Sequence, residues 1–248
     1  MRAIISILLL TLLHSCSAPL YSVMPNDLTM LEKTGQHGGG FSFSNSMIWS
    51  TMTQFGGHYA YALPYGLRAR ADFNLLTGGG RGSQWRSRSL VQSYGLGLGY
   101  HKAFSERVKW ESHLMIRRVS GRYFVVGSSS NEPDFIADYG ANNLNLFTGI
   151  RVNGKKHVHS EIVVGYQWTY LDPIGMVENA LGSDSFTRKY GEVNTLHHPV
   201  VSLNTVYDFE DVQIMLFLTF NVYSGESMDS GSYNSSLLGL KFTKLFNK

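Results

Sequence analysis

The chain has 248 residues, of which 43% are apolar and 13% aromatic, and its formal net charge is +3. This length suits a single domain, and the charges alternate in sign without the basic block that would indicate nucleic acid as a partner. Cys16 is the single cysteine, which excludes an internal disulfide framework.

The N-terminus is typical of a bacterial export signal. One basic residue precedes an almost uninterrupted apolar run over 3–13, which is shorter than the roughly 20 residues that a transmembrane helix needs. Cys16 follows this run directly, as in a bacterial lipobox, where the cysteine is acylated and becomes the first residue of the mature protein. We therefore expect a lipoprotein signal peptide over 1–15 and lipidation of Cys16. An ordinary signal peptide cleaved near Ala18 is the alternative.

The next segment, 16–36, lacks regular alternation and contains two prolines. We expect it to be a lipidated periplasmic tether that ends where the first strand begins. The remainder, 37–248, is then the folded domain.

From that point almost to the C-terminus, apolar or aromatic side chains alternate with small or charged ones. A period of two is the pleat of a β-strand, because successive side chains point to opposite faces. The ten expected strands lie near 38–50, 55–63, 67–75, 89–103, 107–125, 143–152, 157–170, 201–207, 212–222 and 233–246.

The connections between these strands also alternate in length. Short turns are expected at 64–66, 105–107, 153–156 and 210–211, whereas longer polar links are expected near 77–88, 127–141, 173–195 and 226–232, with a short first link near 50–54. Outer-membrane barrels have short periplasmic turns and longer external loops. An even strand count then leaves both chain ends in the periplasm. Phe242 and Phe246 resemble the aromatic C-terminal signal that barrel-insertion machinery recognises.

These patterns predict an all-β protein, a closed antiparallel up-and-down transmembrane β-barrel of about ten strands, with eight as the alternative count. Alternation alone does not say which face is outside. A lipocalin-like soluble barrel would place the apolar residues within. The small residues, glycines and histidines of the opposite face are poor as a solvated exterior, which favours lipid against the apolar face.

The residues expected to point inward form a dense set of charges. In a barrel of about ten strands the lumen is little wider than its side chains, so such charges need partners. We expect a salt-bridged network that holds the barrel shut, and a narrow small-solute pore is the alternative. The predicted network consists of Arg68, Arg70, Asp72, Lys109, Glu111, His113, Arg117, Arg151, His159, Glu161 and Lys241.

The link near 77–88 is basic and carries one tryptophan. The planar guanidinium group of arginine can donate two parallel hydrogen bonds to a phosphate. We therefore expect Arg81, Trp85, Arg86 and Arg88 to contact lipopolysaccharide at the outer rim. A solvated flexible loop without a ligand is the alternative.

Catalytic and metal-binding residues are weakly indicated. His159, Ser160 and Glu161 have the residue types of a hydrolase, but neighbouring residues of a strand face opposite sides. His157 and His159 would share a face as two metal ligands without a third. We therefore expect no catalysis, metal or cofactor, and keep a lipid-modifying barrel enzyme as an alternative.

The segment after Cys16 resembles the opening of small lipid-anchored barrel proteins of Bacteroidetes outer membranes. Its two motifs are Tyr21-Ser22-Val23-Met24-Pro25-Asn26 and Met30-Leu31-Glu32-Lys33-Thr34-Gly35-Gln36, which resemble a Tyr-x-Pro-Asn element and, with an extra Thr34, a Leu-x-Glu-Lys-Gly-like element. The resemblance implies a Gram-negative outer-membrane lipoprotein and supplies no activity. The expected role is structural or accessory, with loops that meet lipopolysaccharide or an outer-membrane protein partner.

Overall fold

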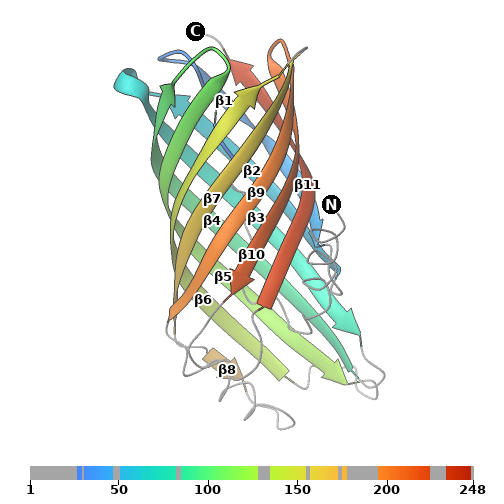
Figure 1. Cartoon of the computed structure of the whole chain (residues 1–248). Coiled ribbons are helices and arrows are strands. Elements are labelled where there is room, and N and C mark those ends of the chain that lie inside the picture. Colours follow the sequence, from blue (N-terminus) through green and yellow to red (C-terminus); the bar gives the residue numbers. More distant parts are fainter. Residues whose placement is uncertain are drawn as a thin grey trace.

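The alternating segments form strands that close into a barrel in the structure of the chain, a computed structural model (Figure 1). The structure describes residues 27–29, 31–46, 51–81, 85–127, 135–154, 157–172, 175–177, 195–223 and 233–246. Its elements are β1 (His37–Ser46), β2 (Thr51–Ala62), the 3-10 turn η1 (Pro64–Gly66), β3 (Leu67–Arg81), β4 (Trp85–Ala103), β5 (Val108–Gly127), β6 (Phe135–Asn153), β7 (Val158–Leu171), β8 (Gly175–Val177), β9 (Thr195–Phe209), β10 (Val212–Tyr223) and β11 (Tyr233–Phe246). In the parts of the chain that the structure describes, no helix is long and apolar enough to cross a membrane.

The barrel is closed by pairing of its first and last strands. β1 and β11 are antiparallel, from His37 opposite Phe246 to Ser46 opposite Leu237. Each of the ten long strands pairs with its neighbour along the chain, and β8 adds three residues to β6 alone. A closed ladder leaves no unpaired edge, as lipid requires. The predicted all-β antiparallel barrel and its ten strands are confirmed.

The two ends of the barrel differ. Short connections join the strands at one end, which we call the turn end; there Gly35 N donates a hydrogen bond to Ala62 O, and Leu245 N donates one to Asp211 O. The start of β1 and the end of β11 lie at this end, at the top of Figure 1. We call the opposite end, where β8 lies, the link end.

Several strands are longer than expected at the link end. β3 ends at Arg81 and β4 begins at Trp85, whereas β5 ends at Gly127 and β6 begins at Phe135. The long links expected near 77–88 and 127–141 are therefore wrong in extent. The reason is physical: a hydrogen-bonded ladder can continue where apolar and polar residues no longer alternate strictly, and there the hydrophobic signal of a strand is lost.

The apolar side of each strand faces outward. Leu96, Ile116 and Ile162 are 71%, 63% and 58% exposed, respectively. Inside, buried polar and charged side chains outnumber buried apolar ones among the described residues. A soluble barrel of the lipocalin type would show the reverse polarity, so this arrangement favours a lipid-facing exterior.

Three glycines of β4 make room inside the barrel. A Cβ atom on Gly95 would lie 2.4 Å from Arg117 Cγ, and one on Gly97 would lie 2.4 Å from Met115 Cγ. The same addition at Gly99 would meet the His113 ring at 2.4 Å. The small residues of β4 thus admit the large inward side chains of β5.

Candidate functional site

The N-terminal segment that precedes β1 lies inside the barrel. Asp27, Leu28, Thr29 and Leu31 are buried. The tether expected over 16–36 is therefore not external throughout, because its described part runs from inside the lumen to the turn end, where β1 begins. We call the described residues 27–29 and 31–36 the plug segment.

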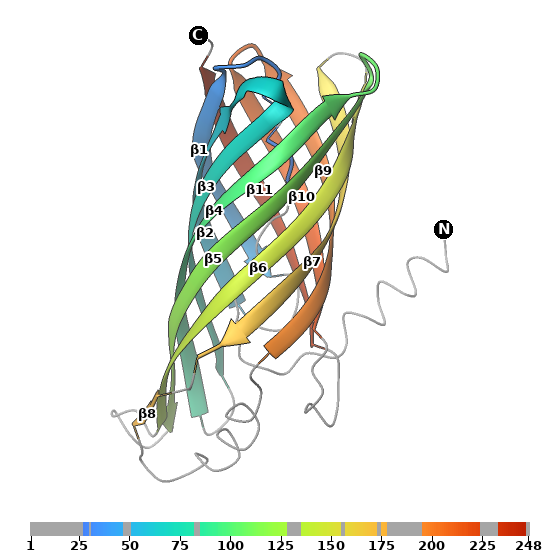
Figure 2. The ribbon, with the colours of Figure 1, turned by 90° about the vertical axis from the view of Figure 1, so that its left-hand side faces the viewer.

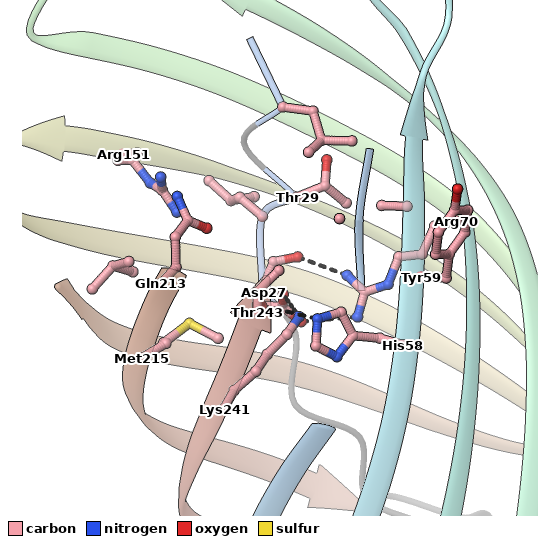
Figure 3. Close-up of a pocket in the computed structure, with 15 residues that line it drawn as sticks. Asp27, Thr29, His58, Tyr59, Arg70, Arg151, Gln213, Met215, Lys241 and Thr243 are labelled. Carbon is pink, nitrogen blue, oxygen red and sulfur yellow. Dashed lines mark hydrogen bonds and ion pairs between the residues drawn. The ribbon is translucent and has the colours of Figure 1, made fainter. Parts of the chain in front are cut away.

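Asp27 is the most strongly held residue of the plug segment. Its Oδ1 accepts a hydrogen bond from Arg70 Nη2 at 2.8 Å, and its backbone oxygen accepts one from Arg70 Nη1 at 2.9 Å. Its Oδ2 forms an ion pair with Lys241 Nζ. Figure 3 shows the carboxylate between these two cations, which come from β3 and β11.

Further contacts fix the segment on its way to the turn end. Thr29 donates to Glu111 Oε1 from its backbone N at 2.9 Å and from Oγ1 at 2.5 Å. Arg68 donates to the backbone oxygen of Leu31. Leu28 packs in a cluster with Met115, Phe147 and Val163, and Leu31 packs against Ala60 and Ala62. The plug segment is thus held by both polar and apolar contacts.

Glu32 forms an ion pair with Lys109 near the turn end. Burial alone would raise the pKa of the Glu32 carboxyl, but the hydrogen bond and the charge of Lys109 outweigh that effect. The pKa therefore lies below its ordinary value, and Glu32 carries its charge at neutral pH.

The wall of the lumen is held by ion pairs between strands, some adjacent and some, such as β3 and β5, separated by one strand. Arg117 donates to both carboxylate oxygens of Asp72, at 3.1 and 3.0 Å. Arg151 Nε donates to Glu161 Oε1 at 2.8 Å, and Asn204 donates to the other oxygen at 2.9 Å. Buried charges of this kind are tolerated because each has a partner.

The wall alone has an excess of positive charge. Among the buried wall residues that the structure describes, five are arginine or lysine and three are carboxylates; they are Arg68, Arg70, Arg117, Arg151 and Lys241 against Asp72, Glu111 and Glu161. The plug segment supplies a further buried carboxylate, Asp27, at Arg70 and Lys241. The segment and the wall are therefore complementary in charge.

Little free space surrounds Asp27. Two cavities lie beside it, of about 20 and about 10 Å³. A single water molecule needs roughly 10–15 Å³, whereas sites for small molecules are roughly 300–1,000 Å³. These two spaces are too small for a substrate.

The structure brings together all the residues of the predicted lumen network. Nine of the eleven are buried, and Lys109 and His159 are half-buried near the turn end, where they pair with Glu32 and Asp208. Sequence reasoning missed Asp27, Thr29 and Asn204. A signal for a missing carboxylate was nevertheless present, because the predicted inward set contains six lysines and arginines and only three carboxylates.

The candidate catalytic and metal-binding residues do not assemble. Ser160 is exposed on the outer face, and Glu161 is engaged by Arg151. His157 lies in a turn with φ of 64°, so the expected shared strand face of His157 and His159 is wrong. The described residues contain no group of three side chains suited to a metal ion. Cys16, the expected site of lipidation, lies outside the described residues.

One further polar cluster lies inside β7 and β9. Thr169 Oγ1 is 2.9 Å from His198 Nε2, and Gln167 Nε2 donates to the same oxygen at 3.1 Å. All three side chains are buried, with at most 4% of their surface exposed. A hydroxyl and an imidazole at this distance have the types of a nucleophile and a base, but the pair is closed to substrate.

Of the residues expected to contact lipopolysaccharide, Arg88 has an exposed side chain. The side chains of Arg81, Trp85 and Arg86 lie outside those that the structure describes, although their backbones belong to β3 and β4. The backbones of β3 and β4 therefore extend into the expected loop, and a contact with lipopolysaccharide stays a prediction.

No protein-family model matches the chain, and no curated protein matches it. Solved structures do. The translocator domain of autotransporter NalP from Neisseria meningitidis is similar with a TM-score of 0.56 and 9% identity, over 89% of this chain and 91% of that one. The β-domain of the Bordetella autotransporter BrkA is similar with a TM-score of 0.52 and 9% identity, over 86% of this chain and 100% of that one.

The chain has the fold of an outer-membrane β-barrel. At 9% identity these likenesses carry the fold and nothing of the activity. They identify no family or lineage, so the resemblance to lipid-anchored barrels of Bacteroidetes and the lipidation of Cys16 stay predictions.

Proposed function

We propose that the protein is an outer-membrane barrel sealed by its own N-terminal segment, which acts without catalysis as a structural or accessory component. The observation that carries this proposal is the buried carboxylate of Asp27 between Arg70 and Lys241. Withdrawing the segment would remove the anion of Lys241 and would leave Arg70 with Asp72 alone, 3.7 Å from its Nε, and breaking a buried ion pair costs about 3–5 kcal/mol. A closed lumen is therefore the stable state.

The arrangement in the membrane follows from the same segment. The apolar outer face meets lipid, and an acyl chain on Cys16 adds an anchor in the inner leaflet of the outer membrane. The short connections at the turn end, where β1 begins and β11 ends, support a periplasmic turn end, and both chain termini are proposed to lie on that side. The link end then faces outward and meets lipopolysaccharide or a protein partner.

The space inside the barrel supports a role other than transport or catalysis. The cavities of about 20 and 10 Å³ beside Asp27 exclude a substrate there. The neighbouring wall charges are paired across strands, as Arg117 is with Asp72 and Arg151 with Glu161. Such pairs close the lumen and stabilise the wall.

Planar-bilayer recording tests the sealed lumen. We expect purified full-length protein to give no reproducible conductance steps under conditions in which an open porin conducts. Reproducible steps of one size from the wild-type chain would overturn the proposal in favour of the narrow pore.

Native mass spectrometry of the protein, extracted in mild detergent from its own outer membrane, tests the accessory role. A second protein retained in fixed ratio supports this role. A lone barrel that removes acyl chains from added lipopolysaccharide would overturn it in favour of the lipid-modifying enzyme.

A further inference from the structure

Neighbouring strands on one side of the barrel continue together at the link end. β4, β5 and β6 have 19, 20 and 19 residues, and β3 reaches the same level, with Arg81 opposite Arg86 of β4. Figure 2 shows β5 and β6 running farther toward β8 than β9 and β10 do. Part of the outer face of β4, β5 and β6 therefore lies on this extension.

The described side chains on the outer face of these strands become more polar toward the link end. Leu96, Ile116 and Leu144 lie side by side in the register and form an apolar row. The next row on the same face includes Arg118, which is opposite both Tyr94 and Asn142. Because residues two apart share a face, the following rows belong to the same surface.

These rows are rich in hydrogen-bond donors. We call the surface the β4–β6 wall; its described polar members are Arg88, Gln92, Arg118, Ser120, Arg122, Asp138 and Asn142, and Leu90 lies among them. Arg122 of β5 is opposite Leu90 of β4, and Arg88 lies two residues from Leu90 on the same face. The side chains of Arg88 and Arg122 are therefore diagonal neighbours on the sheet. Gln92 Nε2 donates to Ser120 Oγ at 3.1 Å.

Two of the three arginines are held in place by carboxylates. Arg122 donates to Asp138 from Nε at 2.6 Å and from Nη2 at 2.9 Å, while Arg118 pairs with Asp172. The Arg122 side chain is nevertheless 61% exposed. A guanidinium has five N–H donors, so a pair that uses two of them orients the group and leaves donors directed to solvent.

We propose that the β4–β6 wall binds lipopolysaccharide, with the phosphates and sugar hydroxyls of the glycolipid on the polar rows and its acyl chains on the apolar rows below. The proposal rests on the proposed function, since it needs the link end to face outward. Arginine forks match phosphate, and amide and hydroxyl side chains match sugar hydroxyls. Direct continuity with the lipid-facing surface favours a membrane glycolipid over a soluble ligand.

The residues of the β4–β6 wall differ in part from those that the sequence predicted to contact lipopolysaccharide. Arg88 belongs both to the residues expected from the sequence and to the wall, where Arg118 and Arg122 accompany it. These two arginines were not expected to bind lipid, because Arg118 and Arg122 lie on the face that is apolar elsewhere along β5.

The test measures binding of purified lipopolysaccharide to lipopolysaccharide-free protein in phosphatidylcholine nanodiscs. We expect R88S/R118S/R122S to bind about tenfold more weakly or worse, as for loss of charge-assisted hydrogen bonds. The matched control is K102S/R107S, which removes exposed cations at the turn end and leaves binding unchanged. The single variant R122K keeps the positive charge but loses the paired N–H donors of the guanidinium group. We expect an intermediate affinity from it, even where the triple variant fails to fold.

Three results would overturn the proposal. They are unchanged binding by both R88S/R118S/R122S and R122K, an equal loss in K102S/R107S, and equal competition by phosphatidylglycerol, which has the phosphate without the sugars.

Orientation is measured separately, with a membrane-impermeant maleimide on Ser105→Cys in the turn end. Labelling only after the outer membrane is permeabilised supports the outward link end. Labelling of intact cells would overturn the proposed orientation irrespective of the nanodisc result.

Discussion

The carboxylate of Asp27 lies 2.8 Å from the guanidinium of Arg70 and joins the N-terminal segment to the barrel wall. Both side chains are almost completely buried, at 1% and 4% exposure. Together with Lys241, which reaches the same carboxylate from the last strand, this pair connects three distant parts of the chain.

Removing the charge of Asp27 should destabilise the folded barrel. Asp27→Asn keeps the shape but removes the anion of Lys241 and leaves Arg70 with Asp72 alone, 3.7 Å from its Nε, so we expect the free energy of unfolding in urea to fall by about 3–5 kcal/mol. The control is Asp211→Asn, since Asp211 forms an exposed pair with Lys244 and should matter by no more than about 1 kcal/mol. Equal losses in the two variants would contradict the account.

Deleting the plug segment should open an anion-selective lumen. Without residues 27–34 the remaining buried wall charges are five cations and three carboxylates, which favours chloride over potassium. The measurement is the reversal potential across a bilayer under a salt gradient. Cation selectivity of the deleted variant, or a lumen that stays closed, would count against the role given to the segment.

The small residues of β4 should be intolerant of added volume. In Gly97→Ala the new methyl group would lie 2.4 Å from Met115 Cγ and 2.8 Å from Leu114 O, so we expect a loss of about 1–3 kcal/mol. At Gly57 a Cβ would meet one atom, Gly40 O, at 4.0 Å, and Gly57→Ala should change stability by less than about 0.5 kcal/mol. Urea unfolding of both variants in lipid vesicles measures these two changes in stability.

The level at which the outer face of β4 becomes polar should mark the membrane boundary. Leu98 lies within the apolar rows and is 63% exposed, so Leu98→Arg should cost about 2–4 kcal/mol in a bilayer. Gln92→Arg, on the same face beyond the boundary, should cost about 0–1 kcal/mol. Similar costs at both positions would place the boundary elsewhere.

The sequence predicted the barrel well because every strand that meets lipid must alternate. The inward positions of Arg70, Glu111 and Arg117 follow from that alternation alone, and each of them is buried. The first part of β6 was missed for the same reason, because Asp138, Gly140 and Asn142 interrupt the apolar outer face there.

The plug segment could not be found by periodicity. It has no regular secondary structure, and its position depends on contacts across large sequence separations, such as that between Asp27 and Lys241, 214 residues apart. The surplus of inward cations indicated that a carboxylate was missing, but not which one supplies it.

Hydrogen exchange of the wild-type protein in nanodiscs tests most directly whether the N-terminal segment fills the lumen. The amide of Thr29 donates to the buried Glu111, so the account predicts exchange as slow as that of the β5 amides around it. Exchange of this amide at the rate of an unstructured peptide, while β5 stays protected, would contradict the sealed lumen.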